Sequence, residues 1–198
     1  MGTKIPLICI TGTSAAGKTH FSEGLARALR EKGYVPVVLA SDDYYRQGWN
    51  PDPIYGFDTI DAIDAEALLR ELEQLQQGNL RQRRRYDMTS KDVSWSALTP
   101  GWDVVILEGA FGPQLLLGQM SPDLLVYVET PLVLRILRRL RRDTRERGRS
   151  LRSVLHQTFS HMIAGEQRFI TPLKERADAV IHNPQKDLKR IVQFVRKI

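Results

Sequence analysis

The chain has 198 residues, of which 42% are hydrophobic and 26% charged, and this balance is ordinary for a globular protein. The length predicts a single domain over residues 1–198. No apolar run reaches the roughly 18 residues of a membrane span, and the N-terminus lacks the pattern of a secretory signal. Cys9 is the only cysteine, which excludes an intramolecular disulfide and favours a cytoplasmic protein.

Apolar runs of strand length alternate with amphipathic segments of helix length. Strands are predicted at residues 6–10, 34–40, 103–109, 123–130 and 178–183, and helices at residues 17–33, 64–78, 131–148, 151–169 and 187–198. Asp64 is expected to cap its helix, and Thr130 with Pro131 to form the N-cap and first turn of another. This alternation predicts an α/β fold with a parallel sheet covered by helices on both faces. Residues of about 46–61 and 81–102 are irregular and are predicted to be insertions above the sheet.

The first strand leads into GTSAAGKT, residues 12–19, which fits the pattern G-x-x-x-x-G-K-[ST]. The two glycines let the backbone turn its N–H groups inward, and these groups with the helix N-terminus form a site for phosphate oxygens. Lys18 would contact the β- and γ-phosphates, and the Thr19 hydroxyl would bind Mg²⁺. The predicted ATP-binding residues are Gly12, Thr13, Ser14, Ala15, Ala16, Gly17, Lys18, Thr19 and His20. The alternative is a glycine-rich turn that binds nothing, and it leaves the four matching positions unexplained.

Two carboxylates follow predicted strands and are expected at the sheet edge that holds this loop. In SDDYYR, Asp42 is predicted to deprotonate an acceptor hydroxyl, but Asp43 has the same chemistry and the motif does not separate the two. The Asp pair could also be a turn or a helix cap. Glu108, at the end of DVVILEG, is predicted to hold Mg²⁺ together with Thr19 and Asp42, or to be a capping acid. No guanine-reading N-K-x-D motif is present, which argues against a GTPase.

Nine arginines lie between residues 135 and 152, where one Asp and one Glu leave a local charge of +7, so the rest of the chain is close to neutral. Val133, Ile136, Leu137 and Leu140 recur at helical spacing and are expected to face the core. The arginines offset from them, on the expected outer face, are Arg135, Arg138, Arg139 and Arg142. Because guanidinium groups suit phosphate oxygens, residues of about 138–152 are predicted to form an arginine-rich lid over a triphosphate. A solvated helix face and a nucleic-acid surface are the alternatives, and the near-neutral remainder argues against the second.

The motifs GTSAAGKT, SDDYYR, GFDTIDAID, RRRYD, VVILEG, RRLRRDTRERGRSL and FITPLKERADAVI occur in the order seen in uridine kinases. Over about residues 5–181 the chain resembles the uridine kinase/phosphoribulokinase family. The resemblance implies a P-loop NTPase fold, a three-layer sandwich with a five-stranded parallel sheet and an arginine-rich helical lid. It also implies transfer of a phosphoryl group from ATP, with Mg²⁺, to the 5′-hydroxyl of a ribonucleoside such as uridine or cytidine.

The resemblance implies roles for single residues. Asp42 matches the catalytic aspartate, Asp58 in GFD matches the acid that holds ribose hydroxyls, and Tyr86 in RRRYD matches a tyrosine at the nucleoside site. Tyr45 in SDDYYR is a further candidate for the acceptor site. The lid and substrate arginines of the family correspond to Arg139, Arg142, Arg147 and Arg149. Of these, Arg139 and Arg142 are expected at ATP, and Arg142 is expected to act in catalysis with Lys18.

The acceptor half departs from the family in three places. Thr59 and Ile60 stand where the family has His-Pro. Lys91 falls nearest to a histidine that contacts the pyrimidine, and it is taken as a substrate-binding candidate. The segment RQRRR before Tyr86 is basic where the family is mostly apolar.

The expected partner is a small-molecule nucleoside, with no nucleic acid and no membrane, and a homo-oligomer is possible because relatives are oligomeric. Two alternatives stay open. The acceptor could be another small hydroxyl compound, such as a sugar phosphate, pantothenate or nicotinamide riboside, and RQRRR would favour an anionic one. The protein could also be a nucleotide-binding regulator without turnover, but the joint presence of Lys18, Thr19, Asp42 and Glu108 argues against this.

Overall fold

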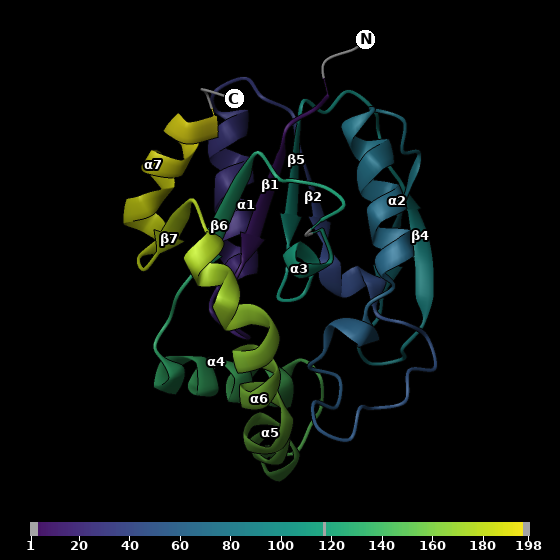
Figure 1. Ribbon diagram of the computed structural model, residues 1–198, viewed down its shortest axis with the longest axis vertical. Coiled ribbons are helices and arrows are strands. Elements are labelled where there is room, and N and C mark those ends of the chain that lie inside the picture. Colours follow the sequence, from purple (N-terminus) through teal and green to yellow (C-terminus); the bar gives the residue numbers. More distant parts are fainter. Residues whose placement is uncertain (1–3, 117, 196–198) are drawn as a thin grey trace.

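The computed structural model describes residues 4–116 and 118–195. Its main sheet has five parallel strands in the order β2-β5-β1-β6-β7, which confirms the predicted α/β fold (Figure 1). The strands are β1 (Leu7–Thr11), β2 (Pro36–Ala40), β5 (Val104–Glu108), β6 (Leu124–Val128) and β7 (Ala179–Ile181). Each strand lies within its predicted range, except that β1 begins and ends one residue later.

Alternating side chains give this sheet two buried faces. On β1, Leu7 and Cys9 belong to one hydrophobic core, and Ile8 and Ile10 belong to the other. The helices that cover the sheet are α1 (Lys18–Arg30), α2 (Ala65–Gln76), α3 (Gly112–Leu116) and α7 (Pro184–Val195). Helices α2 and α3 pack on the core of Leu7, whereas α1 and α7 pack on the core of Ile8 (Figure 1). The result is the predicted arrangement of a sheet between two layers of helices.

The strand order decides which loops meet. Because β1 lies between β5 and β6, the register pairs Ile10 of β1 with Glu108 of β5, and Glu108 with Ala40 of β2. The carboxyl ends of these three parallel strands therefore share one edge of the sheet. The P-loop (residues 12–19), Glu108 and the 3₁₀ helix η1 (Ser41–Tyr44) meet there.

The second predicted insertion is not wholly irregular, because it contains a β-hairpin. Strand β3 (Gln82–Tyr86) pairs antiparallel with β4 (Val93–Ala97) in a separate two-stranded sheet. The arginines of β3 hide the polar and apolar alternation that usually identifies a strand. Long-range contacts hold the hairpin instead, since Asp43 accepts hydrogen bonds from the Tyr86 N–H at 3.1 Å and from Arg85 Nη1 at 3.0 Å. The first insertion consists mainly of turns and ends in the 3₁₀ helix η2 (Ile60–Ala62).

Helix α4 (Leu132–Arg145) is rotated from its predicted orientation, although Arg138 is exposed as predicted and Ile136 and Leu140 are partly buried. Val133 and Leu137 are 70% and 58% exposed, whereas Arg135 and Arg139 are 7% and 4% exposed. The prediction was wrong because it placed the apolar stripe in the core by hydropathy alone. Guanidinium groups can be buried when carboxylates pair with them, and the buried Arg135 and Arg139 have such partners in Glu166 and Asp143.

The start of α4 also differs from the prediction. Pro131 occupies the N-cap position and α4 begins at Leu132, so Thr130 does not cap the helix. The Thr130 hydroxyl instead donates to the Ala16 carbonyl at 2.9 Å, which ties the start of α4 to the P-loop. By contrast, Asp64 caps α2 as predicted, since its Oδ1 accepts a hydrogen bond from the Ala67 N–H.

The predicted helix at 151–169 is one continuous helical segment of mixed type. Helix α5 (Leu151–Gln157) leads into a π-helix, η3 (Thr158–Met162), then into α6 (Ile163–Gly165) and a second π-helix, η4 (Glu166–Ile170). Short π-helical turns are frequent at functional sites. The 3₁₀ helix η5 (Thr171–Arg176) follows and leads to β7.

The closing helix α7 starts at Pro184, three residues before the predicted 187–198. Residues 196–198 of that prediction lie outside the described residues. None of the helices in the described part of the chain has the length and apolar character needed to cross a membrane.

The substitution Leu137→Gln tests the orientation of α4. Because the Leu137 side chain is exposed, we expect the free energy of unfolding to change by less than about 0.5 kcal/mol, as for most surface substitutions. The matched control is Leu72→Ala in α2, where truncation of a fully buried side chain should cost about 2–5 kcal/mol. Urea denaturation measures both values. A loss for Leu137→Gln as large as that of the control would contradict the orientation.

Candidate active site

The P-loop has the backbone geometry that its sequence pattern requires. Gly12, Ala15 and Gly17 adopt positive φ angles of 144°, 59° and 99°. A Cβ atom on Gly12 would lie 2.3 Å from the Val128 carbonyl oxygen, so β6 excludes any larger residue at this position. The loop therefore turns tightly between β1 and α1, as the motif predicts.

Several backbone N–H groups at the P-loop are free. In the described part of the chain, those of Ala15, Gly17, Lys18 and Thr19 donate no hydrogen bond to the protein. They lie at the N-terminus of α1, where the helix dipole adds positive potential. Free donors in this setting form a site for phosphate oxygens. The Lys18 side chain covers the loop, and its Nζ donates to the Thr13 carbonyl at 3.0 Å.

Three oxygen-bearing side chains lie beside Lys18. Thr19 Oγ1 donates to Glu108 Oε1 at 3.1 Å, and Asp42 lines the same cavity. Burial raises the pKa of the Glu108 carboxyl to about 7, and the neighbouring Asp42 contributes to the rise. Burial also lowers the pKa of the Lys18 ammonium, against the opposing effect of Glu108 and Asp42.

This donor set fits Mg²⁺. The ion prefers oxygen ligands and usually binds one or two carboxylates together with the phosphates of a substrate. A cluster of three or more His, Cys, Asp or Glu side chains suited to a metal is absent from the described residues. Phosphate oxygens would therefore complete the coordination of an ion held by Thr19, Glu108 and Asp42.

The structure gives the two aspartates of SDDYYR different surroundings. Asp43 lies behind the cavity, where both of its oxygens accept hydrogen bonds from the hairpin residues Arg85 and Tyr86. Asp42 lines the cavity and accepts no hydrogen bond from the described residues. Of the two aspartates, Asp42 is therefore the one whose carboxylate can contact a molecule bound in the cavity.

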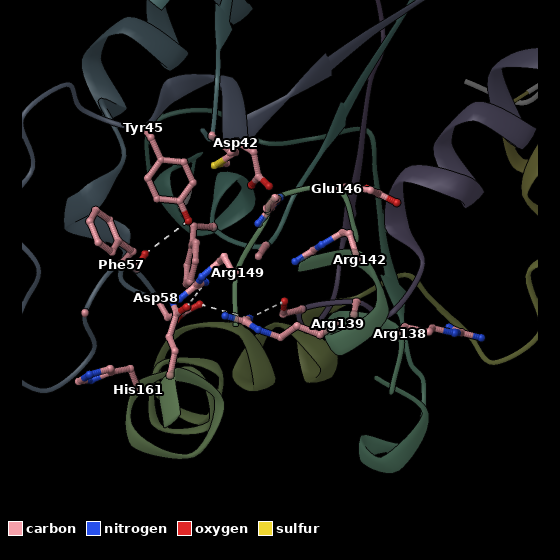
Figure 2. A pocket seen from close by; sticks show the side chains of 18 of the residues that line it. Asp42, Tyr45, Phe57, Asp58, Arg138, Arg139, Arg142, Glu146, Arg149 and His161 are labelled. Carbon is pink, nitrogen blue, oxygen red and sulfur yellow. Dashed lines mark hydrogen bonds and ion pairs between the residues drawn. The ribbon is translucent and has the colours of Figure 1, made fainter. Parts of the chain in front are cut away.

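One cavity of about 1180 Å³ contains most of the predicted site residues. It extends from the P-loop past Asp42 to a corner formed by Tyr45, Phe57 and Asp58, with Arg142 on the other side of Asp42 in this view (Figure 2). The predicted residues that line it are Ser14, Ala15, Gly17, Lys18, Thr19, His20, Asp42, Tyr45, Asp58, Tyr86, Lys91, Glu108, Arg139, Arg142, Arg147 and Arg149. The predicted P-loop residues Gly12, Thr13 and Ala16 are not among the lining residues, and they shape the loop from behind.

Aromatic and polar side chains surround Asp58. The rings of Tyr45 and Tyr86 lie 5.8 Å apart, and the Tyr45 hydroxyl donates to the Phe57 carbonyl at 3.4 Å. Asp58 Oδ2 accepts a hydrogen bond from Gln157 Nε2 at 3.2 Å, and its Oδ1 lies 4.0 Å from Arg139 Nη1. Burial raises the pKa of the Asp58 carboxyl, while Arg139 and Gln157 act in the opposite direction.

A fully buried carboxylate, Asp143, organises the arginine segment. Its oxygens lie 3.6 Å from Arg139 Nε, 2.8 Å from Arg142 Nε, 3.6 Å from Arg147 Nη1 and 3.7 Å from Arg149 Nη1. One negative charge therefore orders four guanidinium groups and leaves an excess of positive charge facing the cavity. Burial lowers the pKa of the Arg147 guanidinium, and Arg142 adds to this effect.

Sequence analysis missed Gln157, Asp143 and Glu166. Each lies on a helix. Gln157 and Glu166 belong to no motif read as functional, and Asp143 lies within the motif RRLRRDTRERGRSL, of which only the arginines were assigned a role. Glu166 accepts a hydrogen bond from the Ser14 backbone N–H at 2.7 Å, from a position 152 residues further along the chain. The sequence offered one signal, which is the position of Asp143 within the arginine run. In the structure this carboxylate lies among four of those arginines.

The basic segment RQRRR does not face the cavity. Arg84 donates to the Tyr45 carbonyl at 2.9 Å and lies 3.4 Å from Asp64, while Arg85 pairs with Asp43. None of residues 81–85 is among those that line the cavity. These arginines hold the hairpin in place, so the expectation that they favour an anionic acceptor loses its basis.

A smaller cavity of about 340 Å³ lies on the other side of the P-loop. Its lining combines the P-loop with the start of α4 and the loop before α7. The residues are Ala16, Gly17, His20, Thr130, Pro131, Leu134, Arg138, His182 and Pro184. Apart from Ala16, Gly17, His20 and Arg138, sequence analysis assigned none of them to a site.

A sequence model of the Phosphoribulokinase / Uridine kinase family matches residues 7–189. The chain belongs to this family. The uridine kinase of Staphylococcus aureus (strain JH9) is 34% identical over 180 residues, which make up 88% of this chain and 86% of that protein. Family membership makes the chain an ATP-dependent phosphotransferase.

Solved structures share the fold. A possible uridine kinase from Bacillus stearothermophilus has a TM-score of 0.65 at 20% identity, over 92% of this chain and 91% of that chain. D-glycerate 3-kinase from Cryptococcus neoformans has a TM-score of 0.59 at 17% identity, over 84% of this chain and 79% of that chain. Identities this low show the fold alone, and the two names belong to kinases of different acceptors.

The buried Glu108 carboxyl should make the stability of the ligand-free protein depend on pH. Its pKa is about 7 in the folded protein against an ordinary value of 4.5. Between these values the folded protein binds more protons than the unfolded chain, so stability should fall as pH rises through this range. Glu108→Gln removes the titrating group and should be more stable than the wild type at about pH 8, by up to about 3 kcal/mol.

Urea denaturation in the presence of a chelator, from about pH 5 to about pH 8, measures this difference. The exposed Glu175→Gln is the matched control and should follow the wild-type curve. A wild-type stability that does not fall over this range, or a Glu108→Gln curve parallel to it, would contradict the burial of an ionisable Glu108.

Proposed function

We propose that the protein transfers the γ-phosphoryl group of ATP to the 5′-hydroxyl of a ribonucleoside, with uridine and cytidine as the first candidates. The observation that carries this proposal is the position of Asp42, which lines one cavity together with Lys18 and Asp58. In-line transfer to a sugar hydroxyl requires a base between the phosphate site and the group that orients the sugar. The uridine kinase of Staphylococcus aureus supports the same acceptor class.

The P-loop side of the cavity would hold ATP. Its free N–H groups would bind phosphate oxygens, and Lys18 would neutralise charge at the β- and γ-phosphates. Thr19, Glu108 and Asp42 would hold Mg²⁺, directly or through water. When bound, this ion would neutralise charge on the transferred phosphoryl group. The smaller cavity is where we expect the adenine, because the flat faces of His20, His182 and Pro184 line it.

Asp42 would accept the proton of the acceptor hydroxyl as its oxygen attacks the γ-phosphorus. Asp43 is unsuited to this role because its oxygens are already hydrogen-bonded to Arg85 and Tyr86. The two neighbouring aspartates therefore have different roles. Asp43 fixes the hairpin that carries Tyr86, whereas the oxygens of Asp42 stay available for Mg²⁺ and for the acceptor hydroxyl.

The corner around Asp58 would hold the acceptor. An ionised carboxylate offers two acceptor oxygens, which suits two neighbouring ribose hydroxyls. Arg139 and Gln157 favour this ionised form and orient it. Tyr45 and Tyr86 would contact the base. The other three arginines around Asp143, which are Arg142, Arg147 and Arg149, would stabilise charge that develops on the phosphates during transfer.

A second candidate function is the phosphorylation of an acceptor that itself carries an anionic group. Lys91 favours it, because this residue lines the cavity and places its ammonium 5.4 Å from the centre of the Phe57 ring. Among the described residues no carboxylate lies within 4.0 Å of that ammonium. A phosphate or carboxylate on the acceptor would pair with it, whereas a pyrimidine offers only neutral carbonyl oxygens.

The pair of variants Asp42→Asn and Asp43→Asn tests the assignment of the base. Loss of a general base typically lowers kcat by about 10²–10⁴, so Asp42→Asn should show this loss with uridine while its affinity for ATP stays near that of the wild type. Asp43→Asn should mainly raise KM for the acceptor, because it loosens the hairpin. A coupled assay of ADP release gives both parameters. If Asp43→Asn shows the larger loss of kcat, the assignment is wrong by one residue.

A further inference from the structure

Glu166 contacts the P-loop although no motif includes it. This residue is 4% exposed, and its Oε1 accepts a hydrogen bond from the Ser14 backbone N–H at 2.7 Å. Arg135 Nη1 donates to the two oxygens of Glu166 at 2.8 and 2.9 Å, and to the Ser14 carbonyl at 3.2 Å. Arg139 Nη1 donates to the Ser14 hydroxyl at 3.0 Å. All three polar groups of Ser14 are therefore held by side chains from α4 and η4.

The N–H group that Glu166 occupies precedes those left free for phosphate. Ser14 lies directly before Ala15, the residue at which the loop reverses with a φ of 59°. In the described part of the chain, the N–H groups of Ala15, Gly17 and Lys18 have no protein acceptor. If the Glu166 carboxylate mimicked a bound phosphate, it would accept hydrogen bonds from these N–H groups. Glu166 instead accepts a hydrogen bond from Ser14, before the turn, and leaves the N–H groups that would donate to phosphate available.

The same helical segment also contacts the acceptor corner. A Cβ atom on Gly165 would lie 2.1 Å from the Asp58 carbonyl oxygen, so the helix passes directly against the Asp58 backbone. Glu166 is the first residue of the π-helix η4. Two consecutive residues therefore contact the two halves of the cavity, Gly165 at Asp58 and Glu166 at Ser14.

We infer that Glu166 is a positioning residue that holds the P-loop in the conformation that binds phosphate. This inference rests on the proposed function, in which the P-loop binds ATP. Hydrogen bonds to an ionised carboxylate are stronger than those between neutral groups. A loop already fixed by such bonds loses less freedom on binding, and this preorganisation increases affinity.

Titration calorimetry with ATP and Mg²⁺, without any acceptor, tests the inference. Glu166→Ala should weaken ATP binding about ten-fold or more, because it removes the acceptor of the Ser14 N–H. Glu166→Gln should recover most of the affinity, since its amide oxygen can accept the same hydrogen bond. Gln167→Ala, at an exposed neighbour on the same helix, is the matched control and should bind ATP like the wild type.

Glu166→Ala also leaves Arg135 buried without its partner, which can prevent folding. The double variant Arg135→Met/Glu166→Leu removes both charges and still frees the Ser14 N–H, so it should show the same loss of affinity in a folded protein. Unchanged or tighter ATP binding in either folded variant would overturn the inference, and tighter binding would mean that Glu166 competes with phosphate. A wild type that binds ATP but phosphorylates no nucleoside would refute the proposed acceptor and leave the test of Glu166 valid.

Discussion

Pairing between buried arginines and buried carboxylates determines how the active-site side of this protein is built. Asp143 is fully buried among four guanidinium groups, and Glu166 pairs with Arg135 at 2.8 Å. Buried charges without partners would cost several kcal/mol each, so these pairs are a condition for burying Arg135 and Arg139 of α4. The same pairs turn Val133 and Leu137 toward solvent. Charge pairing, not hydropathy, therefore sets the orientation of α4 and directs its arginines toward the P-loop.

The parallel sheet supplies the other half of this arrangement. With β1 between β5 and β6, the P-loop, Glu108 and Asp42 come from three separate strands to one edge. Elements outside the sheet form the acceptor corner at this edge. Asp43 holds the hairpin of Tyr86, and the helical segment of residues 151–170 brings Gln157 to Asp58. Arg139 links the donor and acceptor halves, because its Nη1 donates to the Ser14 hydroxyl at 3.0 Å and lies 4.0 Å from Asp58 Oδ1.

The parts of the structure that depend on local sequence could be predicted, and those that depend on distant partners could not. Continuous apolar strands and the pattern of the P-loop carry their own signals, so the sheet and the backbone conformation of the P-loop could be predicted from neighbouring residues. The formation of strand β3 and the orientation of α4 depend on partners far along the chain, such as Asp43 for Tyr86 and Glu166 for Arg135. Hydropathy assigns arginines to solvent unless those partners are known. The contact of Glu166 with Ser14 joins residues that are 152 positions apart, so no local sequence pattern indicates it.

The central claim, that this site phosphorylates a ribonucleoside, is tested most directly by identifying the product. The protein is incubated with ATP, Mg²⁺ and uridine, and phosphorus NMR locates the transferred group, with deoxyuridine and a set of anionic sugars as parallel acceptors. The account predicts a 5′-phosphomonoester of uridine formed with one ADP. It also predicts at least about ten-fold lower kcat/KM for deoxyuridine, because Asp58 would lose a hydroxyl partner, and loss of this preference in Asp58→Ala. Phosphorylation of an anionic sugar, with no nucleoside product, would contradict the claim.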